Sequence, residues 1–186
     1  VIPLQENHTI ANLLRMLDTF CIKDNGLNYE NKSADEMFWI KYEKWFTYCV
    51  IWSLGAPLHE DSRKAFDTMI RGIEDVFPLS QTVFDSYINV EKCEFVKWDD
   101  RLTILPVNWR PKEANTPRHR LLVDTVDTIR CRYLIENDLR NHTCLLLIGV
   151  TGTGKTSIVN SYLSELSDME FSYNIINLSA QTSSPK

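Results

Sequence analysis

The segment "CLLLIGVTGTGKTSIVNSYL", residues 144 to 163, carries the strongest fold signal in this sequence. It begins with an uninterrupted apolar run of strand length, of the kind that is buried on both faces of a parallel sheet. A glycine-rich loop follows, and apolar residues then recur at helical spacing. This order of strand, glycine-rich loop and helix is typical of the start of an α/β nucleotide-binding core.

The loop matches the phosphate-binding pattern G-x-x-x-x-G-K-[ST] from Gly149 to Thr156. Glycines let the backbone turn tightly and approach phosphate oxygens, because they carry no Cβ. Backbone N–H groups at the start of the following helix then form an anion site. Lys155 would place its charge against the β- and γ-phosphates, and the Thr156 hydroxyl would ligate Mg²⁺. We therefore predict a site for ATP or ADP with Mg²⁺, formed by Gly149, Val150, Thr151, Gly152, Thr153, Gly154, Lys155, Thr156 and Ser157.

A P-loop NTPase also needs an acidic group at the end of an apolar strand, which helps to hold Mg²⁺ and polarises the attacking water. No apolar strand ending in two acidic residues follows Thr156. Asp99 and Asp100 lie upstream, in a polar hairpin context. The acids of "YLIEND" (133–138) precede the loop and read as part of a capped, solvated turn. We therefore predict no catalytic residue within this chain.

The first part of the chain has the apolar periodicity of helices. Residues 8–21, 35–55 and 60–77 carry apolar side chains at steps of three and four, which predicts three amphipathic helices. Gly55 and Pro57 are expected to end the second helix. The residues expected to face the interior are Ile10, Leu13, Leu14, Leu17 and Cys21 in the first helix, Phe38, Tyr42, Trp45, Phe46, Cys49, Val50 and Trp52 in the second, and Phe66, Met69, Ile70 and Ile73 in the third.

After Pro78 the apolar period changes to two, which predicts a hairpin of two short strands, 82–90 and 93–98. A proline-rich stretch follows and is expected to be an irregular connection. Asp124 or Thr125 would then cap a further helix. The inward faces are expected to contain Val126, Ile129, Tyr133 and Leu134 in that helix, and Ile158, Val159, Tyr162, Leu163 and Leu166 in the helix after the phosphate loop.

The predicted fold is the N-terminal portion of an α/β P-loop NTPase, preceded by a mainly helical region and a β-hairpin linker. The helical region would span 1–76, the hairpin and proline-rich connection 77–120, and the start of the core 121–186. A second buried strand is expected in 171–183, so the parallel sheet would be incomplete and its apolar edge unpaired. Because the chain begins with Val1 and carries its P-loop near its end, we expect it to be a piece of a longer polypeptide that aggregates or stays partly molten alone.

Composition excludes several classes of protein. The formal net charge of −5 argues against nucleic-acid binding, which needs a surplus of basic residues. We expect no membrane contact, since the sequence has neither a signal peptide nor an apolar stretch long enough to span a bilayer. The cysteines form no CxxC pair and no zinc-binding spacing, which predicts free thiols in a reducing compartment, with Cys144 in the core. These cysteines are Cys21, Cys49, Cys93, Cys131 and Cys144.

Four segments in order carry a resemblance to a known family. They are "FTYCVIWSLGAPLHEDSRKAFD" (46–67), "TVFDSYINVEKCEFVKWDD" (82–100), "LLVDTVDTIRCRYLIENDLRNHTCLLLIGVTGTGKTSIVNSYLSEL" (121–166) and "INLSAQTSS" (176–184). Together they resemble a dynein heavy chain, where the second AAA+ module ends and the third begins. Axonemal dyneins are more similar than cytoplasmic ones, mainly through "GVTGTGKT" and "NLSAQTSS". The helical region would then be the lid of the preceding module.

The resemblance implies a microtubule motor ATPase of the axoneme in cilia and flagella, built from a ring of AAA+ modules. Its third module would bind ATP in a regulatory role, next to neighbouring modules of the same chain. Microtubules and dynein light and intermediate chains would be partners of the intact protein. Contacts to the adenine side of the nucleotide are implied for Leu122, Val123 and Thr125, although Asp124 stands where family members carry proline. The acidic Walker B residues, the sensors and the arginine finger would lie beyond Lys186.

Two other functions remain open from the sequence. One is a stand-alone, non-hydrolysing P-loop module that senses nucleotide. The other is a small P-loop kinase, although such enzymes carry the P-loop near the N-terminus and here it starts at residue 149.

Overall fold

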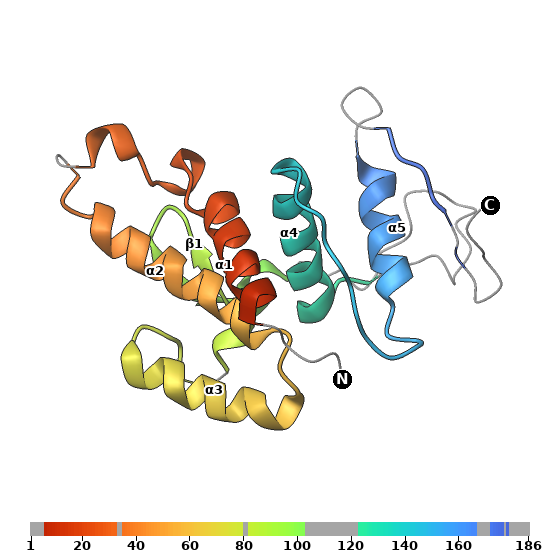
Figure 1. The fold of residues 1–186 in the computed structure, drawn as a ribbon, viewed down its shortest axis with the longest axis horizontal. Coiled ribbons are helices and arrows are strands. Elements are labelled where there is room, and N and C mark those ends of the chain that lie inside the picture. Colours follow the sequence, from red (N-terminus) through yellow and green to blue (C-terminus); the bar gives the residue numbers. More distant parts are fainter. Residues whose placement is uncertain are drawn as a thin grey trace, which may run out of the picture.

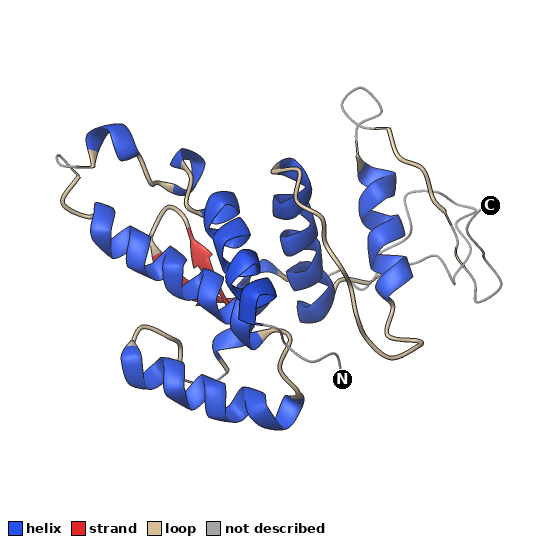
Figure 2. Ribbon diagram, in the orientation of Figure 1, coloured by secondary structure: helices blue, strands red, loops and turns tan. Residues whose placement is uncertain are grey.

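The structure is a computed structural model that describes residues 6–32, 35–79, 82–102, 123–166, 172–176 and 178. Helices dominate these residues, and a two-stranded sheet lies beside them (Figures 1 and 2). The longer helices are α1 (Glu6–Phe20), α2 (Phe38–Val50), α3 (Glu60–Ile73), α4 (Val126–Arg140) and α5 (Lys155–Glu165), and the strands are β1 (Ser86–Asn89) and β2 (Glu94–Lys97). Shorter helical turns are η1 (Lys23–Asn25), η2 (Tyr29–Asn31), η3 (Ile51–Gly55), η4 (Val83–Asp85) and η5 (Trp98–Arg101).

Aromatic side chains of α2 form the centre of the larger hydrophobic core. Trp45 and Tyr48 are almost wholly buried, and both pack on Phe20 at the end of α1, with ring centroids 5.6 and 5.2 Å apart. The Trp45 indole also donates a hydrogen bond to the Asn25 carbonyl at 3.2 Å. In this core, which we call the first cluster, Phe38, Trp45 and Cys49 are buried as predicted, whereas Tyr48 is buried without having been predicted to face the interior. Its buried members are Phe20, Cys21, Leu27, Phe38, Trp45, Tyr48, Cys49, Ile51, Phe66, Ile70, Phe77, Val83, Phe84, Tyr87, Ile88, Phe95 and Trp98.

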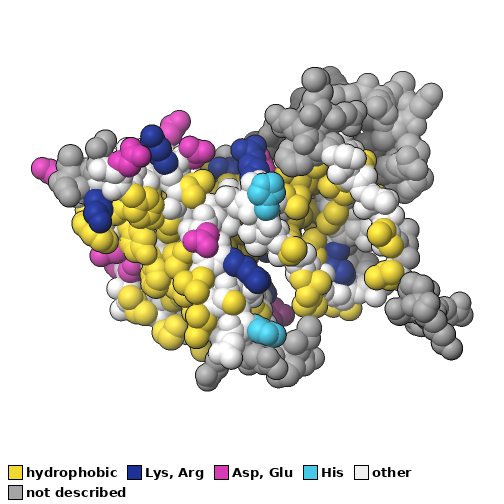
Figure 3. Space-filling model, turned by 45° about the horizontal axis from the view of Figure 1, so that its top comes forward, with side chains coloured by type: hydrophobic (Ala, Val, Ile, Leu, Met, Phe, Trp, Pro, Cys, Tyr) yellow, Lys and Arg dark blue, Asp and Glu magenta, His cyan; other side chains and the backbone are white. Residues whose placement is uncertain are grey.

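The predicted inward faces of the first three helices are too wide. Ile10 and Leu14 on α1 are each 57% exposed, and Ile73 at the end of α3 is 72% exposed. Each helix is covered by its neighbours along a narrower strip than the apolar pattern of the sequence predicted. Hydrophobic side chains therefore remain visible over the helical region in the space-filling view (Figure 3). Phe46 and Met69 are exposed in the same way.

The second predicted helix ends at Gly55, as expected, after a π-helical turn formed by η3. Gly55 is buried, and a Cβ at this position would lie 2.6 Å from Cε1 of Phe66 and 2.9 Å from Cε1 of Phe84. The absence of a side chain thus lets the end of η3 contact α3 and η4 closely.

The predicted hairpin is confirmed, with shorter strands. β1 and β2 pair in antiparallel register, with Tyr87 opposite Val96 and Ile88 opposite Phe95. Residues 83–85 form η4 instead of the start of the first strand, because Thr82 and Asp85 close a capping box around this turn.

Helix α4 lies between the first cluster and α5 (Figure 1). One side packs on the first cluster, where the Tyr133 ring lies 5.3 Å from Trp98 and 6.0 Å from Phe20. The Arg101 guanidinium lies over the same ring, 4.9 Å from its centroid. The other side of α4 contributes Ile135 to a smaller core, the second cluster, together with Ile158 and Tyr162 of α5. The residues of α4 that pack on the first cluster are the four predicted to face inward, Val126, Ile129, Tyr133 and Leu134.

The apolar run before the P-loop is not a paired strand among the described residues. Leu146 and Ile148 are 77% and 69% exposed, and Cys144, which the sequence placed in a core, is exposed too. The described part of the second predicted strand, 172–176 and 178, is also exposed and unpaired. Strand formation needs a partner, and the described residues provide none for either segment. A parallel sheet is therefore not seen in the described part of the chain.

Candidate nucleotide-binding site

Two glycines shape the loop from Gly149 to Thr156. Gly152 and Gly154 have φ values of 89° and 79°, a left-handed region that side chains with a Cβ rarely adopt. No atom would lie within 4 Å of a Cβ at either position, so backbone conformation and not space selects glycine here. Gly154 is the N-cap of α5, which turns the chain from the loop directly into the helix.

The Lys155 side chain lies back across the loop. Its Nζ donates hydrogen bonds to the carbonyl oxygens of Gly149 at 2.9 Å and Val150 at 2.7 Å, and to Oγ1 of Thr153 at 3.2 Å. The Thr153 hydroxyl in turn donates to the Val150 carbonyl at 2.9 Å. A Cβ at Gly149 would lie 3.4 Å from Oγ1 of Thr153 and 3.6 Å from Cδ of Lys155. The oxygen atoms of Gly149, Val150 and Thr153 thus surround the Lys155 ammonium, an arrangement that we call the ring.

The start of α5 has the properties of an anion site. The first backbone N–H groups of a helix have no partner within the helix, and Gly154 has no side chain that could cap them. These donors and the positive end of the helix dipole favour an anion at the start of α5, the helix that Lys155 begins. Thr156 and Ser157 are exposed in the first turn of α5, so their hydroxyls are open to a ligand. The residues present therefore fit a phosphate group accompanied by a metal ion.

Helix α5 is held against α4, which fixes the position of the loop. Ile158 and Tyr162 are buried between the two helices, as the sequence predicted, and contact Ile135. Arg132 of α4 forms an ion pair with Glu165 near the end of α5. The remaining predicted residues of this face, Val159, Leu163 and Leu166, are partly buried in the second cluster.

The residues implied for the adenine side lie before α4. Leu122 is outside the described residues, and Val123 is 55% exposed. Thr125 is the helix cap: its Oγ1 accepts a hydrogen bond from the Thr128 backbone N–H at 3.3 Å, and its own N–H donates to Oγ1 of Thr128 at 2.7 Å. Of the two predicted caps, Thr125 is thus the one used, while Asp124 is exposed just before it.

The acidic residues that the sequence offers as candidates for a catalytic acid differ from the expectation at one position. Asp99 and Asp100 are exposed in η5, which packs on α4, as expected for a polar hairpin end. Asp138, which the sequence placed in a solvated turn, is buried within α4, and burial raises the pKa of its carboxyl to about 6. Its position four residues after Leu134, on the inward face of the helix, was the signal in the sequence. The described residues contain no cluster of His, Cys, Asp or Glu that could hold a metal ion by itself.

No helix in the described ranges has both the length and the apolar character that a bilayer crossing requires. Each of the five cysteines is a free thiol, as predicted.

Comparison with known proteins matches two protein families to successive segments of the chain. The family described as "Dynein heavy chain AAA lid domain" matches residues 1–100, and the family described as "P-loop containing dynein motor region" matches residues 110–186. The chain is similar to dynein axonemal heavy chain 2 of Mus musculus, with 35% identity over 185 residues. It is also similar to the dynein-1-beta heavy chain of the flagellar inner arm I1 complex of Chlamydomonas reinhardtii, with 38% identity over 142 residues.

These alignments cover most of this chain but little of its relatives. The mouse alignment covers 99% of this chain and 4% of the relative, and the Chlamydomonas alignment covers 76% and 3%. Dynein axonemal heavy chain 6 of Homo sapiens, 30% identical over 191 residues, is covered to 4% of its length.

Proposed function

The chain belongs to the dynein heavy chain family, and we propose that it is an ATP-binding part of an axonemal dynein motor. Because the chain spans about 4% of the length of its first relatives, motor activity is a proposal for the protein as a whole. That protein would use ATP to move along microtubules in the axoneme of cilia or flagella. Its partners would be the neighbouring AAA+ modules of the same heavy chain, microtubules, and dynein light and intermediate chains.

Within this chain we propose the three parts that the sequence predicts. Residues 1–76 would be the lid of the preceding AAA+ module, 77–120 the hairpin and connection, and 121–186 the start of the next module, with a regulatory nucleotide site. The family match to a P-loop motor region supports the last assignment. Contacts of α4 with the first cluster support a close structural link between the lid and the nucleotide site.

The observation that carries the proposal is the ring in which Lys155 contacts the Gly149 and Val150 carbonyls at the start of α5. Backbone N–H groups of the loop and the first helical turn would bind phosphate oxygens. The Lys155 ammonium would neutralise part of their charge, and the Thr156 hydroxyl would ligate Mg²⁺. Bound ATP would supply the phosphoanhydride bond whose hydrolysis drives a motor.

The residues described here favour binding over hydrolysis. Among the described residues after Thr156, the acidic one is Glu165. Its carboxylate forms an ion pair with Arg132. We therefore propose that groups outside the described residues supply the acid for hydrolysis. A non-hydrolysing nucleotide sensor is the second candidate, supported by the same observation. The third hypothesis, a small P-loop kinase, is not supported, because both matching families are dynein families.

Equilibrium binding of a fluorescent ATP analogue to the chain tests the proposal. Lys155→Ala removes the positive charge from the ring, and a charge-assisted hydrogen bond contributes about 1.5–3 kcal/mol. We expect affinity to fall by roughly ten- to a hundredfold. Lys92→Ala is the matched control, since Lys92 is an exposed lysine in the hairpin turn.

Each outcome of this experiment has a defined meaning. Equal affinity of wild type and Lys155→Ala would refute the role of the loop, and a loss in Lys92→Ala of the same size would show a non-specific charge effect. Removal of Mg²⁺ with a chelator should weaken binding in wild type. Phosphate release assayed on the same samples separates the two candidates, because a sensor binds nucleotide without turnover.

A further inference from the structure

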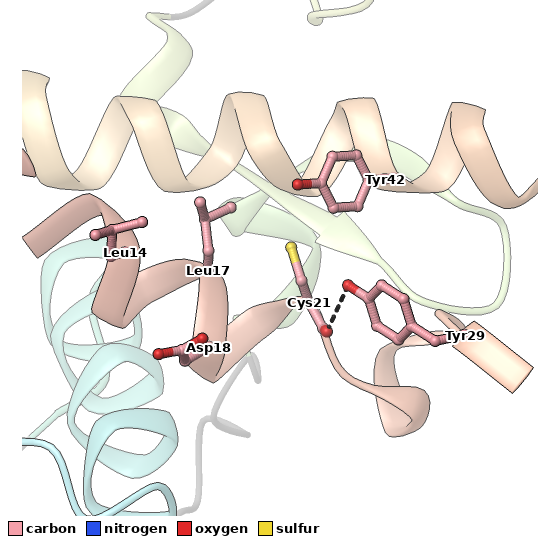
Figure 4. Close-up of a pocket in the computed structure, with 6 residues that line it drawn as sticks. All are labelled: Leu14, Leu17, Asp18, Cys21, Tyr29 and Tyr42. Atoms are coloured by element: carbon pink, nitrogen blue, oxygen red, sulfur yellow. Dashed lines mark hydrogen bonds between the residues drawn. The ribbon is translucent and has the colours of Figure 1, made fainter.

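A groove with apolar walls lies between α1 and α2. Leu14 and Leu17 of α1 form one wall, Tyr42 of α2 lies opposite, and Tyr29 of η2 closes one end (Figure 4). The groove has a volume of about 390 Å³ and is open to solvent, since Leu14 and Tyr29 are 57% and 50% exposed. We call it the α1–α2 groove. Its lining residues are Leu14, Leu17, Asp18, Cys21, Tyr29 and Tyr42.

The apolar surface of the groove continues along both helices. On α1, Ile10 precedes Leu14 by one turn and is equally exposed. On α2, Trp39 and Phe46 lie one turn on either side of Tyr42, with ring centroids 6.0 and 6.5 Å from the Tyr42 ring. Trp39 is 61% exposed and Phe46 is 41% exposed. The two helices thus present neighbouring apolar stripes to solvent over about three helical turns.

The floor of the groove is part of the folded core. Leu17 and Tyr42 pack on the first cluster. The Tyr29 hydroxyl donates a hydrogen bond to the Cys21 carbonyl at 3.0 Å, which Figure 4 marks, and the Tyr29 ring lies edge-on to Phe38 with centroids 5.3 Å apart. The walls are therefore preformed, and a ligand that fits them would have little ordering of the protein to offset.

Each helix adds a carboxylate at the edge of the groove. Asp18 follows Leu14 by one turn of α1, lines the groove and is exposed. Glu43 lies one turn from both Trp39 and Phe46 on α2 and is also exposed. Within the described ranges neither carboxylate forms an ion pair. Both negative charges are thus available to a partner.

The basic side chains of the two helices do not neutralise these edges. Lys41 forms an ion pair with Asp35 at 2.8 Å, and Lys44 donates a hydrogen bond to the Cys93 carbonyl. Arg15 directly follows Leu14 and is therefore turned by about 100° around α1 from it. The groove accordingly combines apolar walls with negatively charged edges.

We propose that the α1–α2 groove binds an amphipathic helix of a separate protein, whose apolar stripe fills the groove and whose flanks carry lysine or arginine. A groove between two helices accepts the apolar stripe of a third, which is a recurring mode of peptide recognition. Basic flanks would lie against Asp18 on one edge and Glu43 on the other. A second copy of this chain fits less well, because its formal net charge is −5 and like charges repel. This interaction is independent of the nucleotide site, which lies at 149–157.

Titration of a labelled helical peptide with the whole chain tests the proposal. The probe is a fluorescein-labelled synthetic peptide with leucine at every third or fourth position and lysine on both flanks of that stripe. Fluorescence anisotropy should show saturable binding, and Leu14→Glu should weaken it by about tenfold or more, because it places a charge in the apolar wall. Leu146→Glu is the matched control, since Leu146 is an exposed leucine outside the groove, and it should bind as wild type does.

A charge exchange tests the chemistry of the partner. A second peptide carries glutamate in place of lysine, and wild type should bind it about tenfold more weakly or worse. Asp18→Lys combined with Glu43→Lys should reverse this preference. Asp75→Lys combined with Glu91→Lys makes the same change of net charge at exposed positions outside the groove and should leave the preference for the lysine peptide in place. Circular dichroism verifies that all variants are folded, and the exchanged carboxylates are exposed, so this arm does not depend on Leu14→Glu.

Several results would overturn the proposal. Equal peptide affinity in wild type and Leu14→Glu would exclude the groove as the binding site, and an equal loss in Leu146→Glu would show general apolar adhesion. A charge preference that both double variants change alike would show a long-range effect of net charge. If the peptide does not bind, and light scattering shows a dimer that Leu14→Glu abolishes, the occupant is a second copy of the chain.

Discussion

Replacing the buried carboxyl of Asp138 by an amide should stabilise the chain at neutral pH. Burial raises the pKa of Asp138 from 3.8 to about 6, a difference of about two units. Each unit corresponds to about 1.4 kcal/mol, so the ionised carboxylate costs the folded state at most about 3 kcal/mol above pH 7. Asp138→Asn keeps the shape and removes the charge. We expect a gain of about 1–3 kcal/mol in the free energy of unfolding at about pH 7.5.

The direction of the pH dependence follows from the two pKa values. Because the folded state holds its proton to higher pH than the unfolded state, wild type loses stability as the pH rises from about 4 through about 6. Below about pH 4 both states are protonated and the advantage of Asp138→Asn should disappear. Urea unfolding at several pH values, at low protein concentration, measures this directly. Tryptophan fluorescence is a suitable signal, since Trp45 and Trp98 are buried in the first cluster on which α4 packs.

A matched variant separates this effect from the general loss of a negative charge. Asp75 is exposed, so Asp75→Asn should change stability by less than about 0.5 kcal/mol at any pH. The reasoning would be refuted if Asp138→Asn were no more stable than wild type at neutral pH, or if its advantage were the same at about pH 4 as at about pH 7.5.

Two further predictions concern packing and exposed surface. Gly55→Ala should destabilise the chain by about 1–3 kcal/mol in urea unfolding, because the new Cβ would overlap the Phe66 and Phe84 rings. Gly72 is exposed in α3, and a Cβ there would have no atom within 4 Å, so Gly72→Ala should be neutral or stabilising. An equal loss of stability in both variants would contradict the prediction. The chain should self-associate through the exposed apolar residues of 145–150 and 175–178, so its apparent mass in light scattering should rise with concentration. A mass of 21.7 kDa at every concentration would refute that prediction.

Features that depend on neighbouring residues in the chain were predicted from the sequence. The phosphate loop is the clearest example, because glycine conformation and the start of α5 are local properties that the spacing of Gly152, Gly154 and Lys155 encodes. The cap at Thr125 and the end of the second helix at Gly55 are of the same kind. Such features could be placed to within a few residues.

Features that depend on distant partners could not be placed in this way. The apolar spacing of Leu14 and Ile73 is that of a buried helix face, but burial depends on which element covers it, and both are exposed. The run around Leu146 has the composition of a buried strand, yet a strand needs a hydrogen-bonding partner. The buried Asp138 was missed for the opposite reason, since an acidic residue is expected in solvent until tertiary packing encloses it.

The position of α4 predicts the order in which parts of the structure unfold locally. The two family matches meet between residues 100 and 110, so a division along the sequence assigns α4 to the P-loop side. Four of its apolar residues, however, pack on the first cluster, while Ile135 and Cys131 contact the second. We expect amide hydrogens of α4 to exchange together with those of α1 and α2 in one cooperative opening, and those of α5 to exchange earlier. The least stable packing contact would then be the one between α4 and α5. It lies one helix beyond the border between the two family matches.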